Sequence, residues 1–298
     1  MNTGATSTSN TPTNANARQS RTGKQTPTPI SEYPASIGSK GGKTTCGAAV
    51  RSSNLLGRGG KNAMSLGRIL VACEYSGTVR DAFAKLGWDA WSCDILPTDS
   101  QGNHIQCDVM SVINDGWDMM VAFPPCTYLT VTGNKWLKDQ PARKSGALVG
   151  EARRKARQEG IAFFNALKNA QVPRIAIENP VGCMSSEWRE PDQIIQPYYF
   201  GDAYQKTTCL WLKNLPLLQH AAEDDWFATR SHVGKGEIHV CKTGNRIPKW
   251  YAYADKSQGQ AARAKNRSKT PRGLAEAMAN QWTRAMREAR NLTQNWED

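Results

Sequence analysis

The chain has 298 residues and a formal net charge of +12 at pH 7, with 38 Lys or Arg against 26 Asp or Glu. This length forms one large domain or two small ones. No apolar run approaches the roughly 18 residues that span a bilayer, and the start lacks the hydrophobic segment of a secretory signal. We therefore expect a cytoplasmic protein with no membrane partner.

Residues 1–62 predict a disordered basic tail. They are rich in Thr, Ser, Asn, Gly and Pro, and residues 1–61 carry eight Lys or Arg against one acid, Glu32. Such a segment buries too little apolar surface to offset its chain entropy. Its charge suits a polyanionic partner. The alternatives are that the tail only maintains solubility, or that it precedes a start at Met64.

After the tail, strand and helix patterns alternate. Residues 68–72 predict a strand, 78–86 a helix and 88–93 a second strand, which together form a βαβ opening. We expect an α/β fold with a doubly wound, Rossmann-like sheet. The expected organisation is a catalytic and cofactor-binding domain at 63–212, a small insert or recognition region at 213–263, and a C-terminal basic segment and helix at 264–298 that complete the catalytic domain.

Residues at the first strand and helix junction indicate a nucleoside site. Gly77 lets the backbone approach a ligand closely, and Asp94 closes the second strand, where an acid can bind ribose hydroxyls. From the residues alone, Glu74 is expected to serve as an acid at the helix N-terminus. Asp108 is expected to cap a turn ahead of Ser111.

Two further apolar runs end in reactive side chains. The run at 117–122 leads into Phe123, Pro124, Pro125 and Cys126, and the paired prolines predict a stiff loop that presents the thiol. The run at 173–177 leads into Glu178, Asn179 and Pro180. The alternatives are a buried structural cysteine and an ordinary Asn-Pro turn. Taken together, the two patterns predict a thiol, an acid and an amide at one sheet edge.

The Pro-Pro-Cys and Glu-Asn motifs, in this order and each after a strand, resemble the catalytic core of DNA cytosine-C5 methyltransferases of the compact phage and prophage type. The resemblance extends from about Arg68 to Trp282. It implies that Cys126 adds to carbon 6 of cytosine, that Glu178 faces the base edge, and that Asn179 positions Glu178 or the loop of Cys126. It also implies S-adenosyl-L-methionine as cofactor, bound near Glu74, Gly77, Asp94, Asp108 and Pro124.

The resemblance implies DNA as the partner, and the target base must leave the duplex stack or be supplied in a single strand. Residues 127–150 predict a basic lid with Lys135. Gln205 and Lys206 begin a predicted strand, and a basic cluster includes Arg263, Lys265 and Arg267. Each of these groups is alternatively an ordinary solvated surface. The insert of about fifty residues leaves little room for side chains that recognise the DNA sequence. We therefore expect a short target sequence or relaxed sequence specificity.

The eight cysteines lack CxxC spacing, which predicts reduced thiols and no metal site. No obligate protein partner is evident from the sequence. Three other functions remain open: modification of cytosine in RNA, transfer of a larger group from a modified sulfonium cofactor, and a catalytically silent DNA-binding protein built on the same fold.

Overall fold

In a computed structural model, the protein has a mixed α/β fold whose described residues are 66–220, 233–253 and 267–294. A seven-stranded sheet has the order β3-β2-β1-β4-β5-β7-β6, and a separate hairpin pairs β8 with β9. The strands are β1 (Arg68–Ala72), β2 (Asp89–Asp94), β3 (His104–Gln106), β4 (Met119–Ala122), β5 (Arg174–Pro180), β6 (Gln193–Ile195), β7 (Thr208–Lys213), β8 (Ile238–Val240) and β9 (Arg246–Pro248).

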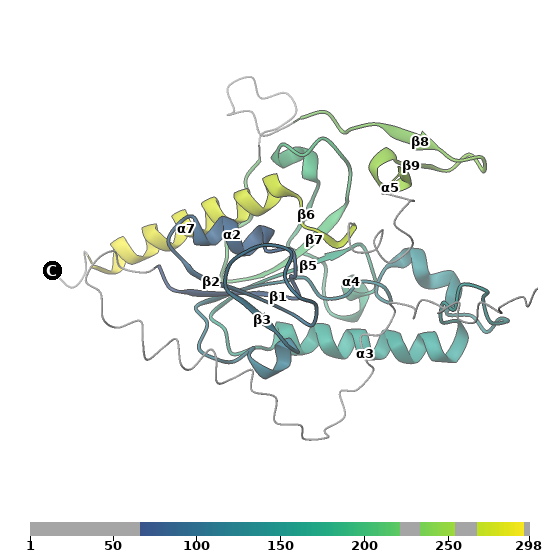
Figure 1. Ribbon diagram of the computed structural model, residues 1–298, viewed down its shortest axis with the longest axis horizontal. Coiled ribbons are helices and arrows are strands. Elements are labelled where there is room, and N and C mark those ends of the chain that lie inside the picture. Colours follow the sequence, from purple (N-terminus) through teal and green to yellow (C-terminus); the bar gives the residue numbers. More distant parts are fainter. Residues whose placement is uncertain (1–65, 221–232, 254–266, 295–298) are drawn as a thin grey trace, which may run out of the picture. The chain divides into compact units, whose positions relative to one another are not determined.

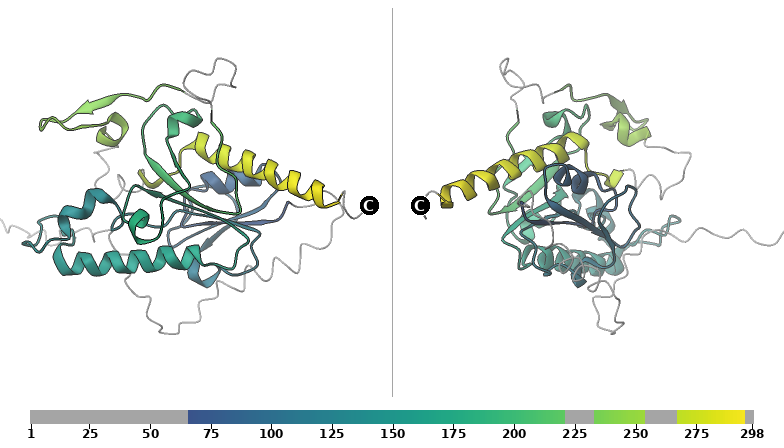
Figure 2. Two further views of the ribbon diagram at one scale, coloured as in Figure 1. Left: turned by 180° about the vertical axis from the view of Figure 1, so that it is seen from behind. Right: turned by 60° about the vertical axis from the view of Figure 1, so that its left-hand side comes forward.

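The helices cover both faces of the large sheet, as the doubly wound prediction requires (Figures 1 and 2). The α-helices are α2 (Thr78–Ala84), α3 (Gly150–Lys168), α4 (Met184–Glu187), α5 (Lys249–Tyr253) and α7 (Arg272–Gln294). Three 3-10 helices are η1 (Val109–Ser111), η2 (Val131–Trp136) and η3 (Pro197–Phe200). In the described part of the chain, no helix combines the length and apolar character needed to cross a membrane.

Each face of the sheet packs on its own apolar core. On one face, Phe83 of α2 and Trp282 of α7 pack against Val121 of β4. On the other face, Phe164 of α3 packs against Trp211 of β7, with ring centroids 5.3 Å apart. The strands are therefore buried on both sides, which explains their nearly continuous apolar sequences.

Strand direction changes at one side of the sheet. Strands β1 to β5 are mutually parallel, whereas β7 runs antiparallel to both β5 and β6. Because of this reversal, the start of β7 lies at the same sheet edge as the ends of β1 to β5. Pro180 at the end of β5 pairs with Thr208 at the start of β7.

Two of the sequence-based boundaries were wrong. Glu178 and Asn179 lie inside β5 rather than after it, because antiparallel pairing with β7 extends β5 beyond its parallel neighbour. Gln205 and Lys206 precede β7 instead of beginning it. There the side chain of Gln196 accepts from the backbone N–H of Lys206 at 3.0 Å, in place of a strand partner.

The connection after β7 stays on the core for several residues. Leu218 is buried, and the indole of Trp282 in α7 donates to the carbonyl oxygen of Pro216 at 3.0 Å. The amide of Gln281 donates to the carbonyl oxygen of Gln219 at 2.8 Å. In this structure, therefore, the start of the predicted insert is fastened to α7 through Pro216 and Gln219, and Leu218 is buried in the core.

Candidate active site

Strand register aligns the carboxyl ends of β1, β2, β4 and β5 at one edge of the sheet. Ala72 of β1 pairs with Cys93 of β2 and with Ala122 of β4, and Ala122 pairs with Ile177 of β5. The next residue on each strand therefore lies at the same level: Cys73, Asp94, Phe123 and Glu178. The carboxyl edge of an open parallel sheet is where such folds bind ligands.

The segment after β4 presents Cys126 at the start of a turn. The carbonyl oxygen of Cys126 accepts from the backbone N–H groups of Leu129 and Thr130, at 3.0 and 3.2 Å. Pro124 is buried and Cys126 is half-buried. The thiol is thus held at a fixed point above the sheet edge, as the paired prolines predict.

Side-chain contacts join the Cys126 loop to the Glu178 strand. The amide of Asn179, which is 1% exposed, donates to the carbonyl oxygen of Pro124 at 2.9 Å. The hydroxyl of Thr208 on β7 donates to the carbonyl oxygen of Lys206 at 2.9 Å, and its proximity to Glu178 lowers the pKa of that carboxyl group. Asn179 therefore ties β5 to the loop of Cys126, and Thr208 lies beside Glu178.

Electrostatic interactions connect the thiol, the acid and one lysine. Burial raises the pKa of Cys126, and the charge of Glu178 raises it further, whereas the charge of Lys206 lowers it. Burial also raises the pKa of Glu178, and Lys206 again opposes the shift. Lys206, predicted from sequence to contact nucleic acid, thus lies close enough to influence both proposed catalytic groups.

A second set of contacts fastens the loops that follow Cys126 and Glu178. Thr130 and Gly182 form an antiparallel bridge, and the backbone N–H of Cys183 donates to the carbonyl oxygen of Leu129 at 2.8 Å. A Cβ atom added at Gly182 would lie 2.4 Å from that same oxygen. Only glycine fits this close approach between the two backbones.

Helix α3 holds the segment after Cys126 through its arginines. Arg153, which is 5% exposed, donates to the carbonyl oxygen of Thr127 at 3.1 Å. Arg157 donates to the carbonyl oxygen of Tyr128 at 2.9 Å. The basic first half of this helix thus anchors the turn that begins at Cys126.

The loop after β1 contains Glu74 and Gly77. Both carboxylate oxygens of Glu74 accept from the N-terminus of α2, from Val79 N–H at 2.7 Å and from Arg80 N–H at 3.3 Å. The structure therefore favours the capping alternative for Glu74. Gly77 has a φ of 73°, in the left-handed region, and a Cβ atom there would lie 2.2 Å from Ser100 Oγ.

The two aspartates predicted near a cofactor have different surroundings. Asp94 is buried at the end of β2, its carboxylate accepts from Leu96 N–H at 2.8 Å, and burial raises its pKa. Asp108 is exposed and accepts from Met110 N–H at 3.0 Å, so it caps η1 as the capping alternative expects. Of the two, Asp94 has the sheltered position that suits contact with ligand hydroxyls.

Arg80 is an important residue that the sequence analysis missed. It is 1% exposed, and its guanidinium donates to Ser100 Oγ at 2.6 Å, to Gln101 O at 2.8 Å and to Ser92 Oγ at 3.1 Å. These bonds hold the loop after β2 against Gly77. An arginine between Val79 and the apolar pair Ala82 and Phe83 in a short predicted helix is a signal that could have identified it.

The segment before α7 returns to this same edge. Ser268 lies 3.3 Å from the hydroxyl of Tyr75, and Lys269 forms a 2.9 Å salt bridge with Asp99. Lys206 Nζ donates to the carbonyl oxygen of Lys269 at 3.4 Å. The segment before α7 thus contacts both the loop after β1 and the loop after β2.

The predicted nucleic-acid contacts are distributed over several elements. Lys135 is exposed on η2, and the indole of Trp250 in α5 donates to the carbonyl oxygen of Gln205 at 2.9 Å. Arg267 stacks on the ring of Tyr251 at 3.6 Å. Arg263 and Lys265 lie outside the described residues.

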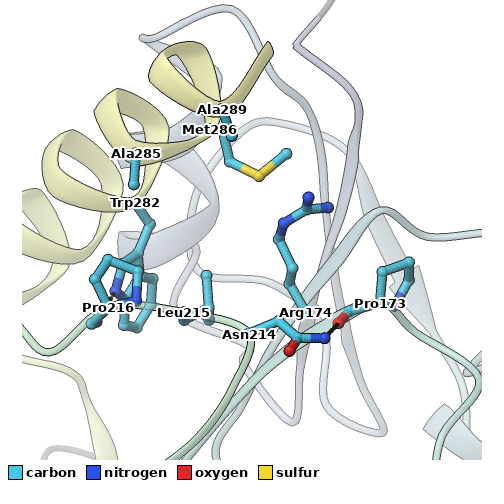
Figure 3. Close-up of a pocket in the computed structure, with 9 residues that line it drawn as sticks. All are labelled: Pro173, Arg174, Asn214, Leu215, Pro216, Trp282, Ala285, Met286 and Ala289. Carbon is cyan, nitrogen blue, oxygen red and sulfur yellow. Dashed lines mark hydrogen bonds between the residues drawn. The ribbon is translucent and has the colours of Figure 1, made fainter. Parts of the chain in front are cut away.

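The described part of the chain shows no candidate metal centre, and one cavity lies away from the Cys126 edge. Within the described ranges, no group of three or more His, Cys, Asp or Glu side chains is placed to hold a metal ion. A cavity of about 260 Å³ lies at the opposite, amino edge of the sheet, between Arg174 and Asn214 on one side and Trp282 and Met286 of α7 on the other (Figure 3). It is therefore separate from the Cys126 edge.

No protein-family model matches the chain, and no curated protein matches it. Among solved structures, one similar chain is a candidate DNA modification methyltransferase encoded within a prophage of E. coli. The two chains are 15% identical with a TM-score of 0.31, and the match covers 49% of this chain and 45% of the other. The similarity thus spans less than half of that protein's length.

Proposed function

We propose that this protein is a DNA cytosine-C5 methyltransferase that uses S-adenosyl-L-methionine. One observation carries the proposal: strand register and the 2.9 Å hydrogen bond from Asn179 to Pro124 place Cys126 and Glu178 at one sheet edge, where the charge of Lys206 acts on both. A thiol, an acid and a cation in one sheltered site suit addition to an electron-poor ring better than any structural role we can assign to them.

In the proposed reaction, Cys126 activates the base. Carbon 5 of cytosine is a weak nucleophile, and addition of a thiolate at carbon 6 makes the ring enamine-like. The thiolate is the reactive form, and Lys206 favours it by lowering the pKa that burial and Glu178 raise. Once carbon 5 has accepted the methyl group, a base removes the carbon 5 proton and the thiolate of Cys126 leaves carbon 6, which restores the ring and the enzyme.

Glu178 stabilises the adduct in this proposal. Burial raises its pKa, which favours the protonated form, and that form would donate toward N3 of the base as negative charge builds on the ring. Thr208 of β7 lies beside the carboxyl group and lowers its pKa, and Asn179 holds the Cys126 loop through Pro124. The reacting groups are thereby positioned before the base arrives.

The residues near β1 and β2 fit the proposed cofactor in the chemistry of their side chains. Asp94 is a sheltered acceptor for ribose hydroxyls. Gly77 remains a proposed contact through its backbone, because Ser100 and Arg80 fill the space where its Cβ would lie. Bound S-adenosyl-L-methionine would supply an electrophilic methyl group. Pro124 borders the same edge, while Glu74 and Asp108 remain proposed contacts in addition to their capping roles.

DNA is the proposed partner, with the target cytosine extruded from the duplex or supplied in a single strand. Lys135, Gln205, Lys206 and Arg267 are proposed to contact it, as are Arg263 and Lys265. The net charge of +12 favours a polyanion. Placement in the cytoplasm is part of this proposal.

Mass spectrometry of nucleosides tests the proposal directly. Plasmid DNA and total RNA are isolated from cells that express the wild-type protein, Cys126→Ala or Glu178→Gln. We expect 5-methyldeoxycytidine to accumulate with the wild type and to accumulate by orders of magnitude less with Glu178→Gln. Cys126→Ala should form none. A heavier deoxycytidine adduct would identify a larger transferred group, and 5-methylcytidine in RNA an RNA substrate. Unmodified nucleic acid despite confirmed expression would overturn the enzymatic proposal.

A further inference from the structure

The turn that follows Cys126 leads into η2, which ends at a cation-flanked tryptophan. The guanidinium carbon of Arg143 lies 3.5 Å from the ring centroid of Trp136, and the ammonium of Lys135 lies 4.8 Å from it. Trp136 is partly exposed, and both cations are exposed or half-exposed. An aromatic face accompanied by cations is the combination that binds unstacked nucleotides.

Helix α3 fixes the backbone on both sides of this tryptophan. Arg157 donates to the side-chain oxygen of Asn134 at 2.6 Å, and Arg154 donates to the carbonyl oxygen of Leu137 at 2.7 Å. Arg157 also donates to the carbonyl oxygen of Tyr128, two residues after Cys126. The ring of Trp136 is thus held at a defined position relative to the thiol, because one arginine joins both segments to the same helix.

We propose that Trp136, with Arg143 and Lys135, is a stacking platform for a base in the strand opened at the target cytosine. The inference rests on the proposed function and deepens it by naming the partner as locally unstacked nucleic acid. Extrusion of a base removes stacking from its neighbours, and an aromatic ring replaces part of what is lost. The base takes the place of one cation on the ring, and that cation pairs with the phosphate of the same nucleotide.

The proposal predicts a difference between paired and opened DNA. Fluorescence anisotropy measures binding, without cofactor, of a labelled duplex that is fully paired and of one with three unpaired nucleotides around a central cytosine. Trp136→Leu should weaken binding of the opened duplex roughly tenfold and should affect the paired duplex less. Trp136→Phe keeps an aromatic face and should retain most of the affinity.

Trp188 provides a matched control because it is also partly exposed and flanked by cations, Lys168 at 4.6 Å and Arg189 at 4.5 Å, but lies after α4. Trp188→Leu should leave the affinity for opened DNA unchanged, with the melting temperature of each variant confirming folding. Equal binding of opened DNA by Trp136→Leu and the wild type, or equal losses in both leucine variants, would overturn the platform.

The binding assay is independent of the methylation assay. If the wild type modifies DNA while Trp136→Leu binds opened DNA normally, only the platform is wrong. If Trp136→Leu binds opened DNA more weakly while the wild type forms no modified nucleoside, the platform stands and the proposed reaction is wrong. Stronger Trp136-dependent binding of an opened RNA duplex than of the DNA duplex would also overturn the assignment of DNA as the partner.

Discussion

The side-chain amide of Asn179 lies 2.9 Å from the carbonyl oxygen of Pro124, and this buried bond ties the end of β5 to the loop that presents Cys126. The two residues are 55 positions apart in the sequence. Pro124 is buried beyond the end of β4, so no strand ladder supplies a donor to its carbonyl oxygen, and the amide of Asn179 does so instead. The bond thereby links the loop of Cys126 to the residue next to Glu178.

Asn179→Ala should therefore reduce both stability and the proposed activity. Removing the donor leaves a buried carbonyl unpaired, which costs about 1–3 kcal/mol of unfolding free energy. Misplacement of the thiol should lower the modification rate roughly 100-fold. Denaturant unfolding and nucleoside quantification measure the two effects.

Asn214 offers a matched control at the other edge of the sheet. Its amide donates to the carbonyl oxygen of Pro173 at 2.8 Å in an exposed position, drawn as a dashed line in Figure 3. Asn214 has a φ of 53°, so Asn214→Gly removes the amide without strain. This variant should modify DNA at the wild-type rate; an equal loss of activity would show that Asn179 has no special role.

The pH dependence of Cys126 alkylation should reveal its two charged neighbours. Iodoacetamide reacts with the thiolate, and peptide mass spectrometry separates Cys126 from the other cysteines. Lys206 lowers the thiol pKa, so Lys206→Met should shift the alkylation midpoint to higher pH. Glu178 raises that pKa, so Glu178→Gln should shift it to lower pH. Shifts of the opposite sign would contradict the arrangement of charges.

Sequence patterns predicted the parts of this fold that depend on residues close together in the sequence. The βαβ opening, the strand before Cys126 and the strand before Glu178 all follow from apolar runs and from the glycine and prolines at their ends. Since parallel strands end at one edge, the meeting of Cys126 and Glu178 followed from the same patterns. The helix at 78–86 and the C-terminal helix were also predicted, and they correspond to α2 and α7.

Contacts between distant segments were not predictable in this way. The end of β5 depends on β7, which pairs with it from about thirty residues later, so the placement of Glu178 inside the strand carried no local signal. Lys206 precedes β7 and approaches Cys126 only because that strand is antiparallel. Arg80 is buried by a loop some twenty residues away, which its own helix pattern does not encode.

Gly182→Ala should disrupt the connection between the segment that follows Cys126 and the segment that follows Glu178. The new Cβ would lie 2.4 Å from the carbonyl oxygen of Leu129, which is a backbone atom that cannot move independently. We expect a loss of about 1–3 kcal/mol in unfolding free energy, with lower modification activity. Gly234→Ala is the control because open space surrounds that position. Similar melting temperatures for both variants would disprove the close approach.

Glu74 should contribute to stability through the N-terminus of α2. Its carboxylate accepts from Val79 and Arg80 N–H groups, so Glu74→Ala should cost about 1–2 kcal/mol of unfolding free energy even without cofactor. Glu74→Gln keeps one acceptor oxygen and should lose less. Thermal unfolding should rank the melting temperatures in the order wild type, Glu74→Gln, Glu74→Ala, from highest to lowest.

The pH dependence of this contribution has a definite sign. Burial raises the pKa of Glu74 above its ordinary value, despite the opposing hydrogen bonds. Its stabilising contribution is therefore complete below the pKa of the unfolded chain and declines as pH rises through the folded pKa. Glutamine does not ionise, so the stability advantage of the wild type over Glu74→Gln should shrink as pH increases. An advantage that grows with pH would mean that the helix N-terminus outweighs burial and holds the carboxylate ionised.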